Sequence, residues 1–74
     1  MTEERVRIEI AFDGGQIMSA LVTPESADAL DRALASSADG TLQLDAEDGR
    51  YSVALRRVVY VKRFAREARV GFGA

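Results

Sequence analysis

The stretch RVRIEIAFDGGQIMSALV, residues 5–22, decides the fold of this chain. From Arg5 to Phe12, every second residue is apolar, which is the period of a half-buried strand. Gly14 and Gly15 supply the positive φ angles of a tight hairpin, so residues 17–22 are expected to return antiparallel to the first strand. This second strand carries apolar side chains on both faces, Ile17 and Leu21 on one and Met18, Ala20 and Val22 on the other.

A helix is predicted from about Pro24 to about Ser37. Thr23 can cap free backbone N–H groups, proline fits the first helical turn, and the early acid Glu25 complements the helix dipole. Gly40 is expected to end the helix. The apolar stripe of this helix consists of Ala27, Leu30 and Leu34, joined at its margin by Ala33 and Ala38.

The residues after the helix are predicted to form further strands. Residues 41–46 alternate again, and the Asp48-Gly49 pair predicts a second hairpin. From Tyr51 almost to Phe64 the pattern is that of a strand, but Arg56-Arg57 interrupts it. A bend or bulge is therefore expected there, which divides the run into residues 51–55 and 58–64.

These elements predict an α+β fold of order ββαββ, with an antiparallel or mixed sheet of four to five strands and one helix on one face. We expect a single domain over residues 1–74, with a folded core over 5–64 and a C-terminal tail over 65–74. Because one helix covers one face, part of the other face is expected to meet a second subunit or the tail. The predicted core consists of Ile8, Ile10, Leu30, Leu34, Leu42, Leu44, Val53, Val59 and Val61.

The composition limits how so short a chain can be stabilised. Its 74 residues include no cysteine and no histidine, so disulfides and the ordinary zinc sites are excluded, and oligomerisation is the reinforcement that remains. The acidic, polar N-terminus and the lack of a long apolar run predict a cytoplasmic protein without a membrane partner. Residues 1–48 carry three basic residues against eleven acids, and residues 49–74 carry seven against one, so net charges of −8 and +6 lie in separate halves.

The residue inventory also argues against an enzyme. Without Cys or His, a nucleophilic serine would need a carboxylate or Lys62, the only lysine, as its base. Asp45, Glu47 and Asp48 lie around a predicted tight turn, where acids are favoured without any cation. The glycine pairs lack the spacing of a phosphate-binding loop. We therefore predict no catalytic residues, no metal site and no cofactor.

The last strand carries the most suggestive pattern. Straight alternation places Tyr60, Lys62, Phe64 and Arg66 on one face and Val59, Val61 and Arg63 on the other. Aromatic rings between cations are typical of proteins that bind single-stranded nucleic acid. In the alternative, Tyr60 and Phe64 belong to the core of a dimer, with the arginines at its rim or paired with acids of a neighbouring subunit. The candidate surface consists of Arg56, Arg57, Tyr60, Lys62, Phe64, Arg66, Arg69 and Phe72.

The overall negative charge favours the second hypothesis, because domains that bind nucleic acid are usually basic. The sequence thus predicts a non-catalytic interaction or regulatory module that acts as a homo-oligomer and binds itself or another protein. The alternative is a nucleic-acid-binding protein that uses the basic C-terminal strand and tail.

Two segments near the C-terminus carry a family resemblance. Residues 58–61, Val-Val-Tyr-Val, followed by residues 69–73, Arg-Val-Gly-Phe-Gly, resemble the end of a family of short actinobacterial proteins of unknown function, one of which is a small mycobacterial T-cell antigen. The order of the other predicted elements is similar along nearly the whole chain. Lys62-Arg63 departs from the family, which tends to have an acid and an apolar residue there. The resemblance implies a fold and a cytoplasmic location, and it brings no catalytic residues.

Overall fold

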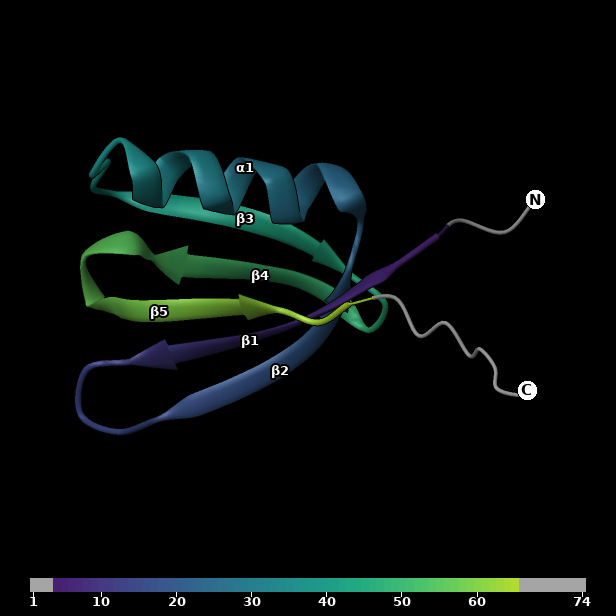
Figure 1. The fold of residues 1–74 in the computed structure, drawn as a ribbon, viewed down its shortest axis with the longest axis horizontal. Helices are drawn as coiled ribbons and strands as arrows, with labels where there is room; N and C mark the ends of the chain where they lie inside the picture. Colours follow the sequence, from purple (N-terminus) through teal and green to yellow (C-terminus); the bar gives the residue numbers. More distant parts are fainter. Residues whose placement is uncertain (1–3, 66–74) are drawn as a thin grey trace.

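The computed structural model describes residues 4–65, which form one antiparallel sheet and one helix (Figure 1). The five strands have the order β4-β3-β2-β1-β5, which confirms the predicted α+β fold of order ββαββ with the additional fifth strand. In chain order the elements are β1 (Val6–Phe12), β2 (Ile17–Val22), α1 (Pro24–Ala35), β3 (Thr41–Ala46), β4 (Gly49–Ala54), a 3₁₀ turn η1 (Leu55–Arg57) and β5 (Val58–Arg63).

The sheet consists of two wings that meet at one point. Strands β2, β1 and β5 form one wing, and the β3–β4 hairpin, paired over six residues of each strand, forms the other. Between β2 and β3 the strand register holds one pair, Val22 with Ala46. Beyond this pair the wings diverge, and η1 joins the edge strands β4 and β5 directly, so the sheet curves back on itself (Figure 1). The concave side holds the core.

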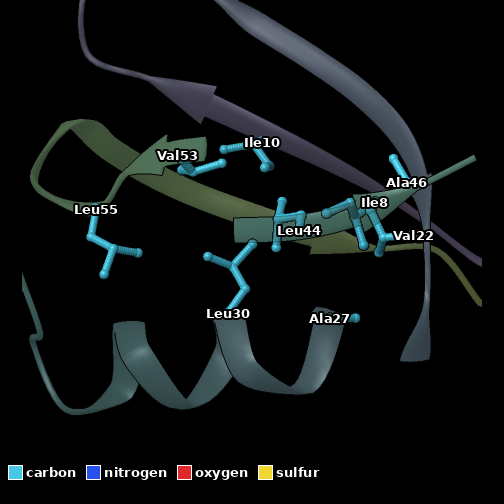
Figure 2. Packing of buried hydrophobic residues seen from close by; sticks show 9 residues of the cluster. All are labelled: Ile8, Ile10, Val22, Ala27, Leu30, Leu44, Ala46, Val53 and Leu55. Atoms are coloured by element: carbon cyan, nitrogen blue, oxygen red, sulfur yellow. The ribbon is translucent and has the colours of Figure 1, made fainter. Parts of the chain in front are cut away.

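The core lies between the two wings and α1 (Figure 2). Leu30 points from the helix towards Leu44, and Val53 lies beside Ile10. The fully buried side chains are Ile8, Ile10, Val22, Leu30 and Leu44. Burial of Ile8, Ile10, Leu30, Leu44 and Val53 confirms that part of the predicted core, while three predicted members pack at its margin, namely Leu34, Leu42 and Val61.

The prediction for Val59 was wrong, because its side chain is 64% exposed. Ala11 pairs with Tyr60, but the next residue, Phe12, pairs with Val58, so Val59 is the extra residue of a β-bulge. A bulge shifts the alternation by one residue. Val58 and Val61 therefore pack against the core, and Val59 does not.

The helix starts as predicted and ends earlier. Thr23 Oγ1 accepts a hydrogen bond from the Ser26 N–H at 3.1 Å, and Pro24 occupies the first turn. The helix ends at Ala35, because Ser37 adopts the left-handed conformation with φ of 56°. The N–H groups of Ser37 and Ala38 then close the helix on the carbonyls of Leu34 and Ala33, at 3.1 and 2.9 Å. Gly40, the predicted stop, instead precedes β3.

Candidate interaction surface

The face of β2, β1 and β5 that points away from α1 is called the outer face here. It follows from the alternation of β1, because Ile8 and Ile10 are buried on the inner side and Arg7, Glu9 and Ala11 therefore point outward. The strand register and the Phe64 N–H bond to the Arg7 carbonyl arrange this face in three rows across the strands. The rows are Ile17–Ala11–Tyr60, Ser19–Glu9–Lys62 and Leu21–Arg7–Phe64.

Three side-chain interactions lie within this face, and two of them, Lys62 with Phe64 and Tyr60 with Glu9, join neighbouring rows. The Arg7 guanidinium and the Lys62 ammonium lie 4.8 and 4.6 Å from the centre of the Phe64 ring, within the range of cation–π attraction. The Tyr60 hydroxyl donates a hydrogen bond of 2.9 Å to the Glu9 carboxylate. This hydrogen bond is the main reason why the pKa of Tyr60 lies above its ordinary value of 10.0.

Two nearby arginines, Arg57 and Arg63, do not belong to the outer face. Arg63 lies on the inner side of β5 and bonds to Asp28 and Asp31 of α1, at 2.9 and 3.3 Å. The bond to Asp28 is the main cause of the raised pKa of Arg63. Arg57 pairs with Asp13 at 3.4 Å. Arg57 and Arg63 are thus paired with acids of the same chain.

The structure therefore divides the candidate surface that the sequence predicts. Tyr60, Lys62 and Phe64 share the outer face, as predicted. Arg56 and Arg57 lie in η1, at the opposite end of β5 from Phe64, and a strand of six residues spans about 20 Å. Arg56 is exposed, without an ion pair to any of the described residues. The remaining candidates, Arg66, Arg69 and Phe72, lie outside the described residues.

Two charged members of the outer face were not predicted as site residues. Arg7 and Glu9 lie on β1, and they became neighbours of the β5 side chains because β1 pairs with β5. The alternation of residues 5–12 placed both on the polar side of their strand, but it did not say which strand lies beside them.

A shallow pocket of about 540 Å³ adjoins one end of the outer face. Arg7, Leu21 and Phe64 from the third row line it, together with Arg63, Ala65 and residues 4–6. It holds a mixture of guanidinium groups and apolar surface.

Two carboxylates around the turn between β3 and β4 have partners within the same hairpin. Asp45 pairs with Arg50 at 3.2 Å, and Asp48 accepts a hydrogen bond of 2.8 Å from the Tyr51 hydroxyl, which raises the pKa of Tyr51. Within residues 4–65 no group of three or more acidic side chains is placed to hold a metal ion.

Comparison with protein-family models, with curated proteins and with solved structures gave no match. In the described part of the chain, no helix has the length and apolar character needed to cross a membrane. The geometry of the outer face is therefore the basis for a functional proposal.

Proposed function

We propose that this chain is a non-catalytic interaction module that self-associates through the outer face. One observation carries the proposal. All of the large exposed apolar side chains within residues 4–65 lie on β2 or β5, and they are Ile17, Leu21, Val59 and Tyr60, with exposed fractions of 59, 39, 64 and 45%. Apolar side chains gathered on one face of a small protein mark an interaction site.

The size of the outer face sets the strength of the association. Three strands spaced about 4.8 Å apart, each rising about 3.3 Å per residue, give a face of about 15 by 20 Å. This footprint is smaller than the roughly 800 Å² per partner of a standard interface. Dissociation constants between about 1 µM and 1 mM are therefore expected, which correspond to about −8 to −4 kcal/mol.

Sedimentation equilibrium between about 1 µM and 1 mM tests the proposal, because this range covers the expected constants. The wild-type chain should pass from monomer to oligomer. The double variant Ile17→Ser, Leu21→Ser should remain monomeric, while Ala54→Ser, a change at an exposed position on the other wing, should behave as wild type. A wild-type chain that stays monomeric throughout would rule out self-association through this face.

Nucleic-acid binding is the second candidate. It draws support from the Phe64 ring beside two cations and from Tyr60 on the same face, since rings and cations together hold single strands. Against it stand Glu9 in the middle row and the pairing of Arg57 and Arg63 with acids. We therefore expect no change in the fluorescence anisotropy of labelled single-stranded RNA or DNA at about 50 mM salt, where electrostatic binding is strongest.

The location and the family are part of the same proposal. A chain without cysteine suits the reducing cytoplasm, where disulfides do not contribute to stability. The resemblance to short actinobacterial proteins rests on residues 58–61 and 69–73, and it carries no activity to this chain.

A further inference from the structure

We propose that the outer face binds a second copy of this chain around a twofold axis that runs parallel to the strands, between β1 and β5. Each Glu9 then meets Lys62 of the other copy. This inference rests on the proposed self-association and adds the geometry of the interface. The order of charges and rings along two neighbouring strands supports this arrangement.

The two strands carry complementary columns. On β1 the outward side chains are Arg7, Glu9 and Ala11. Beside them lie Tyr60 and Lys62 of β5 and Phe64, the residue that follows β5. A twofold axis parallel to the strands and midway between them places the β1 column of one copy over the β5 column of the other. Each residue keeps its position along the strand, so the rows stay matched.

All three contacts made in this way are favourable. Glu9 lies over Lys62 of the second copy, an acid on a base. Arg7 lies over Phe64 of the second copy, where a cation meets the face of a ring. Ala11 is 7% exposed and Tyr60 is 45% exposed, so the third contact covers the Tyr60 ring of the second copy and almost none of Ala11. Each contact occurs twice, because a twofold interface is self-complementary.

The strand β2 extends this interface on both sides. In each copy it lies next to β1, beyond the edge of the β5 that covers β1. Ile17 shares its row with Tyr60, and Leu21 shares its row with Phe64, so each apolar side chain lies diagonally against a ring of the second copy. The arrangement therefore covers the exposed apolar residues of β2 as well as the charged row.

Other twofold axes bring unfavourable pairs together. An axis along β1 stacks Glu9 on Glu9 and Arg7 on Arg7. An axis across the strands, through the middle row, stacks Glu9 on Glu9 and Lys62 on Lys62. Like charges placed opposite each other in an interface cost several kcal/mol.

An axis between β1 and β2 avoids like charges but leaves charges unpaired. It places Glu9 over Ser19 and Arg7 over Leu21, so both lose water without gaining a group of opposite charge. Electrostatic complementarity therefore selects the axis between β1 and β5.

Mixing two charge-reversal variants tests the geometry. In Glu9→Lys the row carries two cations, and in Lys62→Glu it carries two acids, so each variant alone should self-associate about tenfold or more weakly than wild type. In an equimolar mixture both contacts of the mixed dimer join opposite charges. Sedimentation equilibrium of the mixture should therefore show association close to wild type.

The outcomes separate this inference from the proposed function. If wild type never associates, self-association itself fails. If wild type associates but the mixture stays as weak as its components, the face is used in another orientation and the inference is overturned. Rescue in the mixture cannot come from the Glu9–Lys62 neighbours within one chain, because each chain keeps its like-charged pair.

The wild-type chain offers a second measurement that needs no variant. Because the interface contains two Glu9–Lys62 contacts, its dissociation constant should rise as salt increases from about 50 to 500 mM, since salt screens charge pairs that remain partly exposed. A dissociation constant independent of salt would also overturn the inference. Far-ultraviolet circular dichroism of each variant should match wild type.

Discussion

The inner and outer faces of β2, β1 and β5 differ in how far their apolar side chains are buried. On the inner face, Ile8 and Ile10 are 1 and 0% exposed beneath α1 and the second wing. On the outer face, Ile17 and Tyr60 are 59 and 45% exposed and lie among charges. The free energy of folding should therefore come mainly from the inner face. We expect the outer face to accept substitutions that leave the monomer folded.

The largest difference is expected between Leu30→Ala and Leu21→Ala. Leu30 is fully buried at the centre of the core, so its truncation should lower the free energy of unfolding by about 2–5 kcal/mol. Leu21 is 39% exposed on the outer face, and its truncation should cost less than about 1 kcal/mol. Urea unfolding at low protein concentration, where only the monomer is present, measures both.

Leu34→Ala provides an intermediate test. Leu34 lies at the margin of the core, so its truncation should cost less than that of Leu30. Equal losses for Leu21 and Leu30 would show that the outer face contributes to the monomer fold as much as the core does.

The inner face also depends on one buried hydroxyl, that of Ser26, which is 7% exposed. Its Oγ accepts hydrogen bonds from the Thr23 hydroxyl and the Asp45 N–H, at 3.0 and 2.9 Å. The latter bond fastens the start of α1 to β3, where the two wings diverge.

Ser26→Ala should cost about 1–3 kcal/mol, because it leaves the Asp45 N–H without an acceptor. Ser52→Ala, at an exposed position on β4, should stay within about 0.5 kcal/mol of wild type. Thermal unfolding of the two variants compares them directly. Matching melting temperatures for the two would mean that water replaces the lost acceptor.

Local patterns in the sequence predicted most of the fold. The alternation of residues 5–12, the glycines of the first hairpin and the Thr23-Pro24 start each act over a few residues, and their consequences are visible in the chain itself. The bulge at Val59 is different. Residues 58–61 are all good strand formers, so no polar residue marks the extra position, and only the pairing with Phe12 and Ala11 reveals it.

Prediction of the candidate surface depended more on long-range strand pairing than prediction of the fold did. Alternation placed Tyr60, Lys62 and Phe64 on one side of their strand, which holds in the structure. It did not provide the neighbours of that strand, because β5 pairs with β1 across most of the chain. Arg7 beside Phe64 and Asp28 beside Arg63 therefore emerged only with the fold.

A smaller effect, this time an increase in the free energy of unfolding, is expected from a substitution at the end of α1. Ser37 has a φ of 56°, a conformation that costs an L-residue about 1 kcal/mol and costs glycine little. Ser37→Gly should therefore raise the free energy of unfolding by up to about 1 kcal/mol, less the entropy that glycine gains in the unfolded chain.

Ser36→Gly is the matched control, since Ser36 has a φ of −94° and gains nothing from glycine. It should be neutral or destabilising in the same urea titration. If both substitutions destabilise the protein equally, the left-handed turn at Ser37 does not limit stability.

The smallest expected effect is a change in the pKa of Tyr60 on the outer face. Its hydrogen bond to Glu9 holds its pKa above 10.0, and Tyr51, the only other tyrosine, has its pKa raised by Asp48. The hydrogen bond to Glu9 needs the protonated phenol. The contribution of this hydrogen bond to stability is therefore complete below the ordinary pKa and is lost as pH rises through the raised pKa.

Glu9→Gln removes the carboxylate, so one tyrosine should titrate at lower pH in an absorbance titration of phenolate, while the other is unchanged. Asp48→Asn should give the same result for Tyr51, and the two variants together should shift both transitions. An unchanged titration curve in Glu9→Gln would show that the Tyr60 hydroxyl is not bound to Glu9 in solution, and the link between the first and second rows of the outer face would be lost with it.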